Sequence, residues 1–126
     1  MRKPKDDTMP PCVLVAEDEL IIGVDLRDTV EEAGYQVEGP YDRIDSAMLS
    51  IQKRRPDVAI LDVRLDDGDV FPLAEALMNE NVPVIFHSGQ VSAEEMHDRF
   101  PNAQACAKPC PPNLMIDMVR EALEPG

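Results

Sequence analysis

The stretch Val58-Ala59-Ile60-Leu61-Asp62-Val63 decides the fold class of this chain. Its four successive apolar residues predict a short strand covered on both faces, which is typical of the centre of a parallel sheet. The run ends at an aspartate, and a loop containing Asp66, Asp67, Gly68 and Asp69 follows. In open α/β sheets, ligands bind at the edge formed by the carboxyl ends of the strands. We therefore expect Asp62 to lie in a functional site.

Three further apolar runs end in polar residues. These runs and their endings are Val13 to Ala16 before Glu17-Asp18-Glu19, Val82 to Phe86 before His87-Ser88-Gly89, and Ala103 to Ala107 before Lys108-Pro109. Because the carboxyl ends of parallel strands share one edge, we expect several carboxylates, one hydroxyl and one amine to meet there.

Helix-like segments alternate with these strand-like runs. The expected strands cover residues 12–16, 35–39, 57–61, 82–86 and 103–107, and the expected helices cover about 20–33, 45–55, 71–79, 92–99 and 111–123. This alternation predicts an α/β domain with a parallel sheet and helices on both faces. We assign residues 1–11 to a flexible arm, 12–124 to the domain and 125–126 to a tail.

Residues with known positional preferences mark several helix ends. Gly34 fits the residue after the first helix, and Asp45 is the expected N-cap of the second. Pro72 suits the first turn of the third helix. Ser92 with Glu95 forms a capping box that predicts the start of the fourth.

The composition excludes several classes of protein. With 126 residues the chain suits one domain, and its net charge of −13 argues against non-specific binding to nucleic acid or anionic membranes. No apolar run approaches the ~20 residues of a spanning helix, and the polar N-terminal segment predicts no signal peptide. We expect Cys12, Cys106 and Cys110 to be reduced thiols in a cytoplasmic protein.

The acidic residues at the strand ends suggest the chemistry of the site. Glu17, Asp18 and Asp62, with no His or Cys partner set, favour a hard cation such as Mg²⁺. A carboxylate beside Mg²⁺ can attack a phosphoryl donor and form an acyl phosphate. Lys108 would place a point charge on the phosphoryl oxygens, and the Ser88 hydroxyl would donate one hydrogen bond.

These motifs, in this order, resemble the receiver domain of two-component response regulators. The resemblance runs from Cys12 to Leu123, and the stretch from Asp62 to Ala74 resembles stand-alone bacterial receivers. It implies a flavodoxin-like, doubly wound sheet of five parallel strands in the order 2-1-3-4-5. It also implies a signalling module that takes a phosphoryl group rather than a turnover enzyme.

The resemblance assigns roles to individual residues. Asp62 would be the phosphoacceptor, and Asp18, Glu17, Asp62 and the backbone carbonyl of Val63 would hold Mg²⁺. Ser88 would be the switch hydroxyl and Lys108 its ion-pair partner, with a cis peptide bond between Lys108 and Pro109. The implied partners are a histidine kinase or phosphotransfer protein as phosphodonor and a downstream protein target; homodimerisation stays open.

Three positions depart from the family pattern. Ala105 stands where the family usually has a switch aromatic in the fifth strand. His87, before Ser88, is bulkier than the usual residue and is a candidate for the missing coupling. Arg64, two residues after Asp62, is expected to pair with Glu17, to shield the acyl phosphate or simply to be solvated.

Other functions remain as alternatives. A phosphatase with an Asp nucleophile would have a second aspartate in place of Arg64. A flavin-binding fold would need a phosphate loop where Glu17-Asp18-Glu19 stands, and the spacing from Asp62 to Asp69 does not fit a Ca²⁺-binding loop. A pseudo-receiver that docks partners without phosphorylation, and a fragment of a longer protein, both stay open.

Overall fold

A computed structural model describes residues 10–89 and 92–124. Most of the expected arm and all of the expected tail lie outside these residues. The strands are β1 (Cys12–Ala16), β2 (Gln36–Tyr41), β3 (Val58–Leu61), β4 (Arg64–Leu65), β5 (Gly68–Asp69), β6 (Val84–Ser88) and β7 (Gln104–Ala107). The helices are α1 (Leu20–Glu32), α2 (Ile44–Lys53), α3 (Phe71–Asn79), α4 (Ala93–Arg99) and α5 (Pro112–Leu123).

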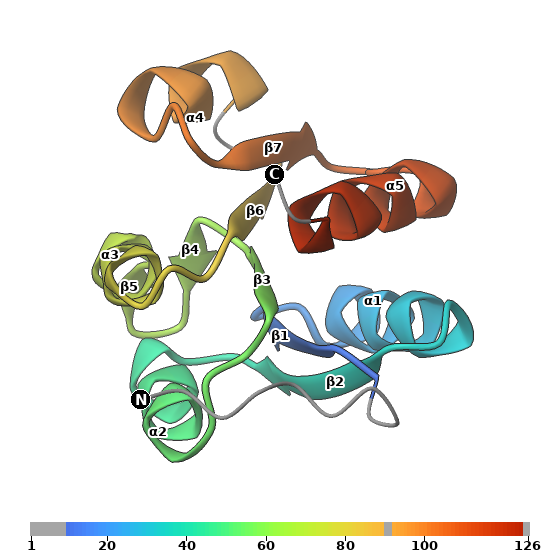
Figure 1. Cartoon of the computed structure of the whole chain (residues 1–126). Coiled ribbons are helices and arrows are strands. Elements are labelled where there is room, and N and C mark those ends of the chain that lie inside the picture. The colour runs from blue at the N-terminus through green and yellow to red at the C-terminus, as the bar shows by residue number, and fades with distance from the viewer. Residues whose placement is uncertain (1–9, 90–91, 125–126) are drawn as a thin grey trace.

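Five parallel strands form the main sheet in the order β2-β1-β3-β6-β7. If the two strands of the small hairpin, β4 and β5, are left out, β6 and β7 are the fourth and fifth strands along the chain. The expected order 2-1-3-4-5 is therefore confirmed. Helices α1 and α5 lie on one side of the sheet, and α2, α3 and α4 lie on the other (Figure 1). The chain thus has the flavodoxin-like fold.

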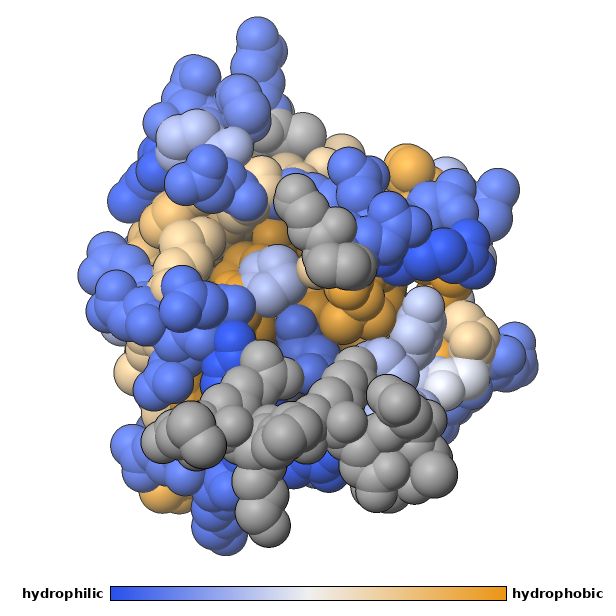
Figure 2. All heavy atoms as spheres, viewed as in Figure 1, coloured by the Kyte–Doolittle hydropathy of each residue, from blue (hydrophilic) through white to orange (hydrophobic). Residues whose placement is uncertain are grey.

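Alternation along the central strands divides the core between the two faces. Leu14 and Leu61 point towards α2, α3 and α4, whereas Val15 and Ile60 point towards α1 and α5. Every residue of β1 and β3 is buried, as expected for strands covered on both sides. Hydrophilic side chains occupy most of the surface seen in Figure 2, consistent with the net charge of −13.

A hairpin follows β3 that the sequence did not reveal. Its two short strands, β4 and β5, pair antiparallel with Arg64 opposite Asp69. Gly68 has φ +134°, a conformation that L side chains rarely adopt. The backbone N–H of Asp66 donates to the carbonyl of Asp42 at 3.0 Å, so the hairpin is tied to the loop that follows β2.

The helix ends are partly as predicted. Gly34 follows α1 with φ +99°, and the Ser92 hydroxyl accepts a hydrogen bond from the Glu95 N–H. The prediction that Asp45 is the N-cap of α2 is wrong, because this helix starts at Ile44 and its N-cap, Arg43, makes no side-chain capping bond. The carboxylate of Asp67 instead accepts from the N–H groups of Ile44 and Asp45, at 2.6 and 3.2 Å.

The cysteines also differ from expectation. Cys106 and Cys110 form a disulfide, with their Cα atoms 5.9 Å apart, so the prediction of three reduced thiols is wrong for this pair. Cys12 is free and buried in β1. Among the described residues, no helix has the length and apolar character needed to span a membrane.

Candidate functional site

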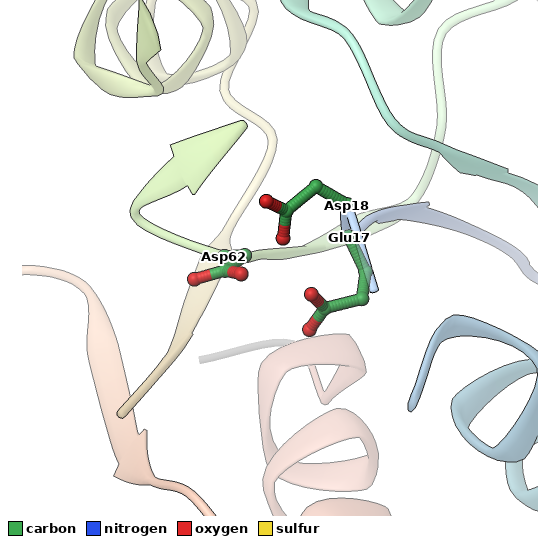
Figure 3. A group of neighbouring side chains, drawn as sticks. All are labelled: Glu17, Asp18 and Asp62. Carbon is green, nitrogen blue, oxygen red and sulfur yellow. The ribbon is translucent and has the colours of Figure 1, made fainter. Parts of the chain in front are cut away.

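Three carboxylates converge at the carboxyl edge of the central strands. Glu17 and Asp18 follow β1, and Asp62 follows β3, its paired neighbour. Figure 3 shows the three side chains facing a common space. One oxygen from each lies within 4.8 Å of the others, so the sequence prediction that these acids come together is confirmed.

Lys108 joins two of these acids. Its Nζ lies 2.7 Å from Oε1 of Glu17 and 3.0 Å from Oδ2 of Asp62. The Glu17 side chain is completely buried, and the Lys108 side chain is only 12% exposed. A charged pair this deep depends on each partner, because removing one leaves the other without compensation.

The pKa values of Glu17 and Lys108 are both raised, but by different causes. Desolvation raises the pKa of Glu17; Lys108 opposes the shift, and the nearby Asp62 adds to it. Burial lowers the pKa of Lys108, but its contacts with Glu17 and Asp62 outweigh burial, so this pKa is raised. The acids repel one another as expected for clustered like charges, and a divalent cation would relieve that repulsion. The all-oxygen donor set fits Mg²⁺.

The strand pairing positions the hydroxyl and the amine. Ser88 is the last residue of β6 and lies opposite Ala107 in β7. The backbone N–H of Lys108 donates to the carbonyl of Ser88 at 3.0 Å, which fixes where the lysine leaves the sheet. The peptide bond between Lys108 and Pro109 is cis, as expected.

The hairpin determines the surroundings of Val63 and Arg64. The Val63 carbonyl accepts a hydrogen bond from the Val70 N–H at 2.8 Å, so one of its two lone pairs is already used. The exposed Arg64 guanidinium lies 3.7 Å from the carboxylate of Asp69. Arg64 lines the cleft beside Asp62. It pairs with Asp69 rather than with Glu17, whose cationic partner is Lys108.

His87 and Ala105 lie on opposite faces of the sheet, His87 towards α1 and α5 and Ala105 towards α2, α3 and α4. His87 is 4% exposed, with Nδ1 3.9 Å from Oε1 of Glu17. Burial, reinforced by the positive charge of Lys108, lowers its pKa to about 4, so the ring is neutral at pH 7. Ala105 pairs with Phe86, whose ring centroid lies 5.2 Å from that of Phe100. An aromatic side chain from the end of α4 thus packs in this part of the core.

Sequence reasoning missed part of the site. A cleft of about 330 Å³ is bounded by Glu19, Asp66 and Gly89 in addition to the predicted residues. The N–H of Glu19 donates to Oε2 of Glu17 at 3.1 Å, which helps to orient the buried acid. The acidic run Glu17-Asp18-Glu19 was the available signal, but only the fold shows which acid is buried.

The chain matches the family model described as the response regulator receiver domain over residues 13–120. Among curated proteins, it is 27% identical to the transcriptional regulatory protein PdtaR of Mycobacterium tuberculosis, covering 90% of this chain and 56% of the relative. It is 29% identical to the phyllosphere-induced regulator PhyR of Methylorubrum extorquens, covering 88% and 43%. The chain spans about half the length of these relatives.

Solved structures show the same fold. The receiver domain of PhyR from Erythrobacter litoralis has a TM-score of 0.82 at 24% identity, covering 96% of this chain and 98% of that one. The receiver domain of a modulated diguanylate cyclase from Desulfovibrio desulfuricans has a TM-score of 0.77 at 27% identity, covering 90% and 94%. With the family match over residues 13–120, the ordered strand-end motifs show that this chain belongs to the response regulator receiver domain family.

Proposed function

We propose that this chain accepts a phosphoryl group on Asp62, with Mg²⁺ bound beside it, and switches a protein-docking surface in response. The observation that carries the proposal is the position of Lys108, whose Nζ lies 3.0 Å from Asp62. A fixed cation beside a carboxylate at a strand end supplies the charge that an incoming phosphoryl group needs.

Glu17, Asp18 and Asp62 would hold the cation. When bound, Mg²⁺ supplies positive charge that offsets the charge on the phosphoryl oxygens. A carboxylate oxygen of Asp62 attacks phosphorus while the bond from phosphorus to the donor atom breaks. For a phosphohistidine donor, the leaving imidazole keeps that electron pair. Lys108 pairs with the transferred phosphoryl oxygens, and the Ser88 hydroxyl donates to one of them.

The donor would be a histidine kinase or a phosphotransfer protein, and the product a changed contact with a downstream protein in the cytoplasm. Added negative charge shifts a two-state surface by changing local hydrogen bonds and ion pairs. In this proposal the chain is a phosphoacceptor rather than a turnover enzyme. Its acidity disfavours direct contact with nucleic acid or anionic membranes. We propose no phosphatase activity. Such an enzyme would have a general acid two residues after the nucleophile, and that position holds Arg64, whose guanidinium lies 3.7 Å from the carboxylate of Asp69.

The test is phosphoryl transfer from acetyl phosphate in the presence of Mg²⁺, read by intact mass. The wild type should gain one phosphoryl group, and Asp62→Asn should gain none. Asp66→Asn is the matched control, because Asp66 lies at the same cleft but outside the converging acids, and it should be modified like the wild type. No adduct on the wild type, together with no binding of Mg²⁺ and beryllium fluoride, would contradict the proposal and leave a pseudo-receiver.

A further inference from the structure

The segment that follows β7 carries Lys108 into the site but has few means of attachment to the sheet. On its N-terminal side, Lys108 is held by the bond from its N–H to the carbonyl of Ser88. On its C-terminal side come Pro109, Pro111 and Pro112, which have no N–H to donate. Backbone hydrogen bonding by these three residues is therefore limited to their carbonyl groups.

The disulfide between Cys106 and Cys110 spans this segment. Cys106 belongs to β7, and Cys110 follows the Lys108–Pro109 bond, so Lys108 is the middle residue of a five-residue covalent ring. The Cα atoms of the two cysteines are 5.9 Å apart, within the range that disulfides normally span. The covalent link thus provides the attachment that the prolines cannot.

One end of the disulfide can be reached from solvent. Cys110 is partly exposed and lines a hollow of about 460 Å³ between α1 and α5, together with Leu26, Thr29 and Met115. Cys106 is only 8% exposed. Of the two cysteines, Cys110 is therefore the one that a thiol entering the hollow can approach. Lys108 borders the same hollow, so Cys110 and Lys108 line one common space.

We propose that Cys106 and Cys110 form a thiol–disulfide exchange site, open to low-molecular-weight thiols, that regulates the phosphoryl site through Lys108. The regulatory part rests on the proposed function, since it concerns the lysine that would pair with the phosphoryl group. In the disulfide form Lys108 is held between Glu17 and Asp62; in the dithiol form the segment after it is freer and the lysine is less well placed.

The exchange is balanced by two molecules of the small thiol. The first, as a thiolate, attacks Sγ of Cys110; the bond to Cys106 breaks, and Cys106 leaves as a thiolate that takes up a proton. A second thiolate attacks the sulfur of the small molecule in the mixed disulfide and releases Cys110. The protein disulfide is reduced to two thiols, and the two small thiols are oxidised to one disulfide. The reverse sequence, from oxidised glutathione, restores the protein bond.

The first measurement counts thiols. The full chain is treated with oxidised glutathione or with dithiothreitol, quenched in acid, denatured and alkylated. We expect one alkylated cysteine after oxidation, namely Cys12, and three after reduction. Three alkylated cysteines in both samples would overturn the proposal, because no disulfide would then exist to exchange.

The second measurement follows Lys108 itself, without Mg²⁺ or phosphodonor. Amide hydrogen exchange at Lys108, read by NMR, should be at least about tenfold faster in the reduced protein, since loss of the link permits local opening. In Cys110→Ser, the amide of Lys108 should exchange as fast as in the reduced wild type, and dithiothreitol should not change that rate. Cys12→Ala, the matched control, should respond as the wild type does. Equal exchange rates in oxidised and reduced wild type would overturn the regulatory part.

The third measurement is the rate of phosphoryl capture from acetyl phosphate. Reduction should slow it by about three- to tenfold, because small misplacements of a positioning group cost rate. Equal capture rates in the two forms would overturn the regulatory part. If neither form captures phosphate, the proposed function fails and the regulatory part falls with it, while the thiol count and the Lys108 exchange still decide whether the link holds the lysine.

Discussion

The carboxylate of Asp67 accepts a hydrogen bond from the backbone N–H of Ile44 at 2.6 Å. A residue 23 positions away in the sequence thus caps the N-terminus of α2. The N-terminal N–H groups of a helix lack intrahelical partners, and a side-chain oxygen normally satisfies one of them. Here the oxygen comes from the hairpin that follows Asp62. The pKa of Asp67 is lowered chiefly by this bond to Ile44, so the carboxylate is the favoured form.

Loss of this cap should destabilise the protein. Asp67→Ala should lower the free energy of unfolding, because removal of a capping side chain leaves N-terminal N–H groups of the helix without their partner. Asp45→Ala is the matched control. Asp45 is exposed, and among the described residues its ion pair is with the exposed Arg43, so this substitution should lower the free energy of unfolding by less. Urea denaturation measures both. A larger effect for Asp45 would show that the sequence-based assignment of the cap was right.

Removal of the central cation should be more costly. Lys108→Ala leaves the buried Glu17 and Asp62 without their shared partner. We expect a loss on the order of 2 kcal/mol in the free energy of unfolding, below the usual cost of breaking a buried pair because Glu17 can take up a proton. Lys53→Ala, on the exposed end of α2, should change stability by less than about 0.5 kcal/mol. Similar losses for the two variants would contradict the role assigned to Lys108.

Glu17 should make the metal-free protein less stable at alkaline pH. Its folded pKa is raised by burial, so the folded state binds the proton more tightly than the unfolded state does. The resulting stabilisation is complete below the unfolded pKa and is lost as pH rises through the folded pKa. Thermal unfolding from pH 5 to 9 should show this decline in wild type and a smaller one in Glu17→Gln. An unchanged decline in the variant would assign it to another group.

His87 should act in the opposite direction at acidic pH. Its folded pKa, about 4, is below its ordinary value of 6.5, so the unfolded state binds its proton first. Stability should therefore fall as pH drops from 6.5 towards 4, by about 2 kcal/mol after allowing for partial solvation. Urea denaturation should show a weaker fall in His87→Gln. His97→Gln, at an exposed position on α4, is the matched control and should behave like wild type. A fall in His87→Gln as large as in the wild type would contradict the role assigned to His87.

The central part of the fold was predictable because burial on both faces leaves a strong pattern. The apolar run Val58 to Leu61 predicts a covered strand, and in the structure each of its residues is 0% exposed. Parallel pairing then brings the residue after each strand to one edge, which is why Asp62 and Lys108 meet although they are 46 positions apart. The ends of two other strands differ from the prediction: β2 runs to Tyr41 rather than Gly39, and β6 extends to Ser88.

What the sequence did not predict depends on contacts between distant residues. Asp45 has the residue type of a cap, but the N–H groups of Ile44 and Asp45 are instead capped by Asp67, from a hairpin whose strands contain only two residues each. The link between Cys106 and Cys110 depends on the path of the chain around Pro109. The composition contains no information on that path, so the prediction of reduced thiols relied on the expected cytoplasmic location.

The bond from the Asp66 N–H to the carbonyl of Asp42 makes the loops after β2 and β3 a single unit. This matters for recombination between related domains. If residues 62–69 are grafted into another receiver, the cap residue Asp67 is separated from the α2 whose N–H groups it binds. In the recipient, Asp67 then faces a second helix whose N-terminus did not evolve with that carboxylate. Residues 42–45 therefore need to be transferred together with the hairpin, so that donor and recipient exchange both halves of the contact.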